Sequence, residues 1–208
     1  MTGGDDSQLT SYDNPAVAVA QVQVGLLANA RDLQPELDKM ALTADTATAS
    51  GRATVLQEAT LALLRHPEYW VYGATESQQT ALTSAEAKFN QLALAERSKF
   101  TQETLTNVNS QLRNVLKESL SESDSQLVAQ EIPSESEYIM VTIVVGVDGK
   151  LTLPKINNTD DLTQALKSIG SIGSDRLLAV EVLWTPQAEG DTLTKDDILA
   201  QYPNVKLV

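Results

Sequence analysis

The chain has 208 residues, of which 42% are hydrophobic, and this suits one globular domain or two small ones. The formal net charge is −13 at pH 7, so the surface should repel nucleic acids and anionic lipid surfaces. The absence of cysteine excludes disulfides, thiolate nucleophiles and cysteine-ligated metals. No run approaches the roughly 20 apolar residues of a membrane span, and no basic segment precedes an apolar run as in a signal peptide.

The first predicted strand follows a polar arm. Residues 1–14 are rich in glycine and aspartate, and we expect a disordered arm or a non-native start. Residues 15–28 alternate between an apolar face and a mixed face that carries Gln21 and Gln23. The second half, QVQVGLL, is the better strand, whereas the alanine-rich first half could equally begin a helix.

Two helices are predicted next. Apolar residues at i, i+4 and i+7 spacing over residues 33–41 predict one helix, with Asp32 as its cap. A second helix spans about residues 52–65 and stops at His66-Pro67, because proline disfavours helical geometry in the residue before it.

The middle of the chain gives weaker patterns. Residues 68–73 contain three aromatic residues and predict a short strand or an aromatic bend. A third helix is predicted over about residues 77–97, and residues 101–117 favour a further helix or an extended segment. Residues 119–136 carry acids without any lysine or arginine, which is typical of a mobile acidic loop.

The densest β-branched run is EYIMVTIVVGV, residues 137–147. Both of its faces are largely apolar, so it predicts an interior strand that is covered on both sides. Asp148-Gly149 then predicts a tight turn into a second hairpin strand over residues 150–153.

The rest of the chain alternates between helix and strand. The predicted elements are, in order, a helix over residues 159–170 capped by Thr159, a strand over residues 176–184, a short helix from Thr194 to Pro203, and a strand over residues 204–208. Together these elements predict a single α+β domain over residues 15–208. Its sheet should be mainly antiparallel or mixed, with four to five strands and helices packed on it.

The residues that could carry chemistry do not form a catalytic pattern. His66 is the only histidine, and no G-x-S-x-G motif is present, so His66 is interpreted as the C-cap of the second helix. The pairs Asp160-Asp161 and Asp196-Asp197 lie where acids favour a helix N-terminus. Glu181 interrupts an apolar strand, and we expect it to face solvent or to pair with an arginine. We therefore predict no enzyme, no catalytic or metal-binding residue and no cofactor.

Aromatic residues cluster around the only histidine and suggest a possible interaction surface. Its members would be His66, Glu68, Tyr69, Trp70, Tyr72 and, from another element, Trp184. Aromatic residues at a strand are more often packed in a core, and this alternative stays open.

Several motifs resemble a cyanobacterial and chloroplast family of unassigned molecular function. The most specific are LLRHPEY at residues 63–69 and AVEVLWTPQ at residues 179–187, within a match from about residue 12 to residue 203. The family includes a plant chloroplast protein of fluctuating-light acclimation. The sequence departs from the plant pattern at residues 110–136, as expected for a variable surface loop.

The resemblance implies a setting in photosynthesis. It implies a membrane segment that precedes this region, localisation at a thylakoid or plastid-type membrane with the domain exposed at the membrane surface, and partners among thylakoid or photosynthetic membrane proteins. It also implies a regulatory role in fluctuating-light acclimation, non-photochemical quenching and control of the proton gradient, through protein–protein interaction. The alternatives are a small-molecule sensor domain and an enzyme that uses carboxylates.

Overall fold

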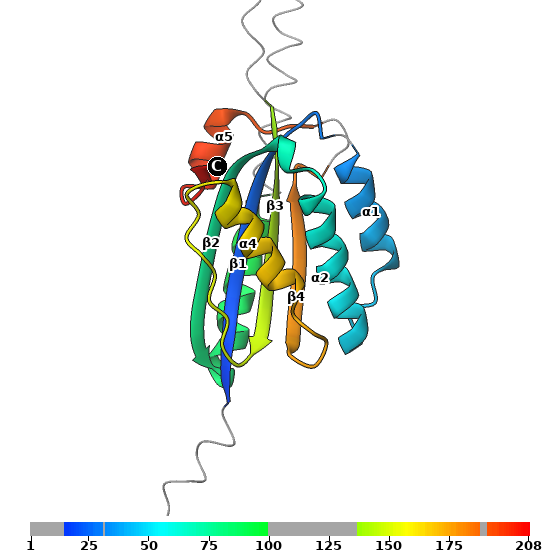
Figure 1. The fold of residues 1–208 in the computed structure, drawn as a ribbon, viewed down its shortest axis with the longest axis vertical. Coiled ribbons are helices and arrows are strands. Elements are labelled where there is room, and N and C mark those ends of the chain that lie inside the picture. Colours follow the sequence, from blue (N-terminus) through cyan, green and yellow to red (C-terminus); the bar gives the residue numbers. More distant parts are fainter. Residues whose placement is uncertain (1–14, 31, 100–136, 188–190) are drawn as a thin grey trace, which may run out of the picture.

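The computed structural model describes residues 15–30, 32–99, 137–187 and 191–208, and these form one antiparallel sheet with helices on both faces (Figure 1). The strands are β1 (Ala16–Leu27), β2 (Trp70–Ala81), β3 (Tyr138–Asp148), β4 (Leu177–Thr185) and β5 (Lys206–Leu207). Their order across the sheet is β4-β3-β1-β2-β5, and every pair is antiparallel. The predicted α+β class is therefore confirmed.

Helices connect the strands. They are α1 (Leu33–Thr43), α2 (Ala49–Leu64), a helix over residues 82–99, α4 (Thr159–Gly170) and α5 (Lys195–Gln201), with a short 3-10 turn at Pro67–Tyr69. Within the described residues no helix is both long enough and apolar enough to cross a membrane.

The first face of the sheet packs against α2 and α4, and we call it the α2/α4 face (Figure 1). It exists because β1 and β3 place apolar side chains there at every second position, in matched register. The buried residues that β1 and β3 contribute to this face are Ala18, Ala20, Val22, Val24 and Leu26 from β1 and Val141, Ile143, Val145 and Val147 from β3. Helix α1 packs on the outer side of α2.

The opposite side, which we call the second face, packs against the helix over residues 82–99 and against α5. Val17, Val19 and Val144 contact the first of these helices, whereas Met140 packs with Ile198 of α5. Because both faces are covered, β3 is almost entirely buried and pairs with a strand on each side. The prediction of an interior strand at residues 137–147 is therefore confirmed.

The largest difference from the predicted elements is in the middle of the chain. Strand β2 continues to Ala81, so residues 77–81 are extended and the next helix begins at residue 82 instead of 77. The alanine-rich start of β1 is strand and not helix, because it pairs with β2 and β3 along its whole length.

The hairpin expected after Gly149 does not form. Gly149 has a positive φ of 82°, as the turn requires, but residues 150–153 pair with no strand. The segment instead leaves the sheet and crosses toward β2, with Leu153 and Ile156 buried in the core. Burial of these two apolar side chains is favoured over pairing of residues 150–153 in a hairpin.

Two predicted caps are displaced by one residue. Helix α4 is capped by Asn158, whose side chain accepts from the Asp161 backbone N–H, and not by Thr159. Helix α2 has Arg65 as its C-cap, and His66 is the N-cap of the following 3-10 turn. The predictions for residues 1–14, 101–117 and 119–136 lie outside the described residues.

Candidate functional site

A buried carboxylate on the second face organises the most polar part of the interior. The helix over residues 82–99 presents Glu96 to β1 and β3, and this residue is 4% exposed. Gln21 Nε2 and Gln23 Nε2 donate to Glu96 Oε1 at 3.2 and 2.9 Å, and Thr142 Oγ1 donates to Glu96 Oε2 at 3.2 Å. We call Glu96, Gln21, Gln23, Thr142 and Lys99 the Glu96 cluster.

Lys99 supplies the positive charge of this cluster. Its Nζ lies 2.7 Å from Glu96 Oε1 and 3.7 Å from the centroid of the Tyr202 ring. The ring face attracts a cation, and the carboxylate forms a charge-assisted hydrogen bond with it. Lys99 therefore connects its own helix to Tyr202, the residue that follows α5.

The cluster fixes the side chains that border a neighbouring pocket. The amides of Gln21 and Gln23 are held by Glu96, and the same two residues line a pocket of about 310 Å³ beside β2. We call this the edge pocket, and its lining residues are Gln21, Gln23, Gly73, Ala74, Thr75, Glu76, Lys155, Ile156, Asn204 and Lys206.

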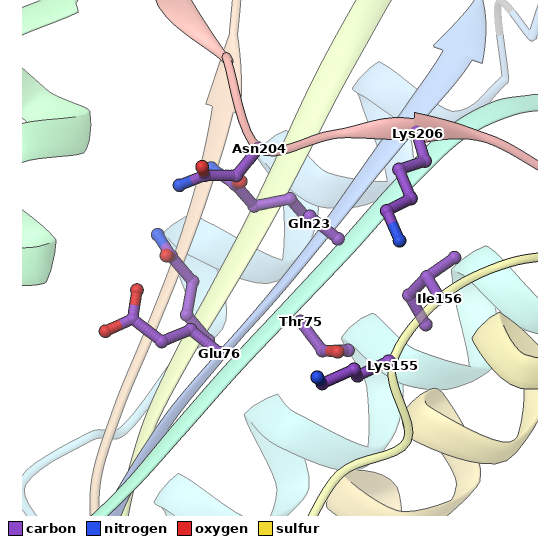
Figure 2. Close-up of a pocket in the computed structure, with 10 residues that line it drawn as sticks. Gln23, Thr75, Glu76, Lys155, Ile156, Asn204 and Lys206 are labelled. Carbon is purple, nitrogen blue, oxygen red and sulfur yellow. The ribbon is translucent and has the colours of Figure 1, made fainter.

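The edge pocket straddles the outer margin of β2. In Figure 2 the β2 ribbon runs between Glu76 and Asn204 on one side and Lys155, Ile156 and Lys206 on the other. This arrangement follows from strand geometry, since Glu76 points to the second face and its neighbour Thr75 points to the α2/α4 face. Thr75 Oγ1 donates to the Pro154 carbonyl at 2.5 Å and so holds the crossing segment against β2.

The outer side of β2 is an open sheet edge within the described part of the chain. Strand β5 pairs with Tyr72 and Gly73, and no described strand pairs beyond them. The Val71 carbonyl accepts from the Val208 N–H, so the odd-numbered backbone groups of β2 point outward. The N–H and C=O groups of Thr75, Ser77 and Gln79 are therefore directed away from β1 and toward any added strand.

The charges at the edge pocket differ between its two sides. Lys155 and Lys206 are exposed, and neither forms an ion pair with a carboxylate of the described residues. On the other side Glu76 accepts a hydrogen bond from Lys88 at 2.7 Å. The site thus offers backbone donors and acceptors, three side-chain amides and two cations. These groups suit the binding of an extended peptide segment or of an anionic group.

The residues predicted as an interaction surface are divided by the sheet. Trp70 and Trp184 are buried in the core beneath the α2/α4 face, and Tyr72 is buried on the second face. His66, Glu68 and Tyr69 lie at or near the surface, with His66 Nδ1 3.4 Å from Glu68 Oε1 and the His66 and Tyr69 ring centroids 6.0 Å apart. Whether these three surface residues bind a partner stays a prediction.

Tyr72 packs edge-on against Tyr138, with ring centroids 5.3 Å apart. Burial, and secondarily the hydrogen bond and charge interaction with Tyr138, raise the pKa of the Tyr72 phenol above its ordinary value. The neutral phenol is therefore the form that this part of the core accommodates.

The other acidic residues that the sequence singles out have local partners. Glu181 Oε1 accepts from Arg97 Nε at 2.7 Å, in agreement with the predicted arginine pair. Asp161 and Asp197 receive hydrogen bonds from the residues at the starts of α4 and α5, and Asp197 completes a capping box with Thr194. No group of three or more potential metal-ligating side chains occurs among the described residues.

The sequence analysis missed the Glu96 cluster, although two signals were present. Gln21 and Gln23 alternate on one face of an otherwise apolar strand, which indicates a shared polar partner. Glu96 lies four residues after Leu92, so it continues the buried stripe of its helix. A glutamate on a buried stripe needs donors on the opposing strand, and the two glutamines provide them.

These features define a class: an antiparallel α+β domain whose accessible polar site is an open sheet edge supported by a buried ionic cluster. The chain belongs to the DUF1517 family, described as proteins of unknown function, whose model matches residues 16–208. The family resemblance drawn from the sequence motifs is confirmed.

Two relatives are substantially similar along the chain. Protein FLAP1 homolog A of Synechocystis sp. is 55% identical over 207 residues, which is 100% of this chain and 62% of that protein. FLUCTUATING-LIGHT-ACCLIMATION protein 1, chloroplastic, of Arabidopsis thaliana is 43% identical over 201 residues, 96% of this chain and 48% of that protein. The chain thus spans about half to three fifths of the length of these relatives. No solved structure is significantly similar to it.

Proposed function

We propose that this chain is a non-enzymatic domain of a protein that acts in acclimation of photosynthesis to fluctuating light. The support is the similarity of nearly the whole chain to a relative named for that process, at 43% identity. The similarity to the FLAP1 homolog A of Synechocystis sp., at 55% identity, also supports the proposal. The proposed outputs are non-photochemical quenching and control of the proton gradient.

The proposed mode of action is protein–protein interaction at the open edge of β2. One observation carries this proposal. Strand β5 pairs with β2 only as far as Gly73, and the backbone N–H and C=O groups of Thr75, Ser77 and Gln79 point outward along the same edge beyond it. An extended segment of a partner protein would add to the sheet there and satisfy those groups. Lys155 and Lys206 favour an acidic side chain on the α2/α4 side of the added segment.

The proposed location is the surface of a thylakoid or plastid-type membrane. The support is the word chloroplastic in the name of the Arabidopsis relative and the greater length of both relatives. The additional length of the whole protein would supply the membrane anchor, and the domain described here would contact thylakoid or photosynthetic membrane proteins.

An affinity experiment with two variants at one position tests the proposed edge. Ser77→Pro removes an outward N–H, which proline tolerates on an edge strand because no ladder hydrogen bond is lost inside the sheet. Ser77→Ala keeps that N–H and removes only the hydroxyl, so it is the matched control. Each protein is immobilised, incubated with a detergent extract of thylakoid membranes, and the bound proteins are quantified by mass spectrometry.

We expect the wild type and Ser77→Ala to recover the same photosynthetic membrane proteins. Ser77→Pro should recover at least tenfold less of each of these proteins. Thermal unfolding of the wild type and of both variants checks that the fold is retained. Equal recovery by Ser77→Pro would show that the β2 edge is not the interaction site. Recovery of no thylakoid protein above a control resin by the wild type would overturn the proposed function itself.

A further inference from the structure

A second hollow lies on the second face, at the end of the sheet away from the Glu96 cluster. It runs between the helix over residues 82–99 and β4, and its volume is about 470 Å³. We call it the apolar groove. Its floor is formed by Val17, Val19, Gly146 and Ala179, and Phe89 forms part of its helical wall.

The groove exists because two small residues face each other on neighbouring strands. Gly146 of β3 pairs directly with Ala179 of β4, so the sheet surface is low at this point. A Cβ placed on Gly146 would lie 3.5 Å from the Ala179 Cβ and 3.9 Å from Phe89 Cδ2, which are ordinary contact distances. The position above Gly146 therefore accepts a Cβ in ordinary contact with Ala179 and Phe89, and a larger side chain there would extend into the groove.

The rim of the groove exposes large apolar side chains. Leu82, at the start of the helix, is 44% exposed, and Leu178 of β4 is 43% exposed. Leu178 lies at the register shift between β3 and β4, where the strands are irregular, and this allows its side chain to stand beside the groove. Two leucines held at the mouth of an apolar hollow keep apolar surface in water, which a bound apolar molecule would remove.

We propose that the apolar groove binds an uncharged, largely apolar small molecule. Its volume lies within the roughly 300–1,000 Å³ typical of ligand pockets, and its lining is dominated by aliphatic and aromatic carbon. Asn90, on the helical side, can donate and accept hydrogen bonds and would orient one polar group of the ligand. This assignment is independent of the β2 edge and goes beyond the proposed function.

The charge of the lining residues and the size of the groove favour an uncharged small molecule over an anionic ligand or a protein. Glu86 is the single ionisable residue of the lining, and no lysine or arginine lines the groove, so an anionic head group would meet repulsion without a compensating cation. A protein partner needs roughly 800 Å² of contact surface per side. Here the apolar atoms line a hollow of about 470 Å³ with Thr83, Glu86 and Asn90 on its helical side, which suits a small molecule better than a protein surface.

Substituting a larger side chain at Gly146, on the floor of the groove, tests the proposal. The probe is N-phenyl-1-naphthylamine, a neutral dye that becomes fluorescent in apolar surroundings, titrated into the 208-residue protein. We expect saturable binding of one dye per chain to the wild type. Gly146→Leu should weaken dye binding at least tenfold, whereas Gly146→Ala adds only a Cβ at ordinary contact distance and should change the dissociation constant less than threefold.

Two further variants make the outcome decisive. Ala179→Leu fills the same space from β4 and replaces Gly146→Leu if that variant does not fold, as judged by thermal unfolding. Leu42→Asn removes an 88% exposed leucine on α1 and should leave dye binding unchanged. Unchanged binding in both filled variants would overturn the proposal, as would a wild type that binds no dye. Self-association that Gly146→Leu abolishes would also overturn it, since a second copy would then be the occupant.

Discussion

Truncating Glu96 should be one of the most damaging single changes in the described part of the chain. Glu96→Ala leaves three buried donors, on Gln21, Gln23 and Thr142, without their carboxylate, and leaves the Lys99 ammonium without its partner. Each unsatisfied buried donor costs about 1–3 kcal/mol, and breaking a buried ion pair from one side costs about 3–5 kcal/mol. These terms overlap, because water enters the truncated site, so we expect a loss of about 3–5 kcal/mol in the free energy of unfolding.

Urea denaturation followed by tryptophan fluorescence measures this loss, because Trp70 and Trp184 are both buried in the folded state. With a shift of about 2–4 °C per kcal/mol for a chain of this size, the melting temperature should fall by about 10 °C. Glu96→Gln keeps one acceptor oxygen and should cost less, and Glu58→Ala, at an exposed helical glutamate, should change stability by less than about 0.5 kcal/mol. A Glu96→Ala loss below about 1 kcal/mol would refute the assigned role of the cluster.

Three other predictions follow from close contacts, a turn and a shifted pKa. Gly170→Ala places a Cβ 2.5 Å from Thr60 Oγ1 between α2 and α4, so it should destabilise the protein by about 1–3 kcal/mol in urea denaturation, and adding Thr60→Ala should recover part of the loss. Gly149→Ala puts a side chain at a φ of +82° and should lower thermal stability by about 1 kcal/mol, with no change contradicting the assigned turn. The raised pKa of Tyr72 means that its stabilising contribution is complete below about pH 10 and is lost as the pH rises further. Tyr72→Phe should therefore show a shallower decline of unfolding free energy above about pH 10 than the wild type, and parallel curves would contradict this cause.

The covered strands were accessible to sequence reasoning because their periodicity has one physical cause. In β3, apolar residues recur on both faces, and a strand with two apolar faces must be covered on both sides. The second half of β1 alternates between an apolar face and a mixed face, which also indicates a strand. The same reasoning located β4 and the amphipathic stripe of α4. Element type was correct where burial imposes a pattern.

The second half of β2 was missed because burial imposes no such pattern there. Residues 76–79 are exposed on an edge strand, so their polar sequence ESQQ carries no alternation. The apolar residues that follow have helical spacing, and this extended the predicted helix backward to residue 77. What keeps residues 77–81 extended is pairing with the start of β1, about 60 positions earlier in the chain, which a local pattern cannot reveal.

The two faces of the sheet therefore carry different constraints. The α2/α4 face is occupied by apolar side chains from β1, β3, α2 and α4. A substitution there therefore lowers the stability of the fold through lost packing contacts. The second face is covered mainly by one helix and α5, and the helix over residues 82–99 changes character along its length. Its first turns border the apolar groove, and residues 96–99 bring Glu96 and Lys99 toward the side chains that line the edge pocket. The same helix thus lines the apolar groove directly and, through the hydrogen bonds of Glu96, holds the two glutamines that line the edge pocket.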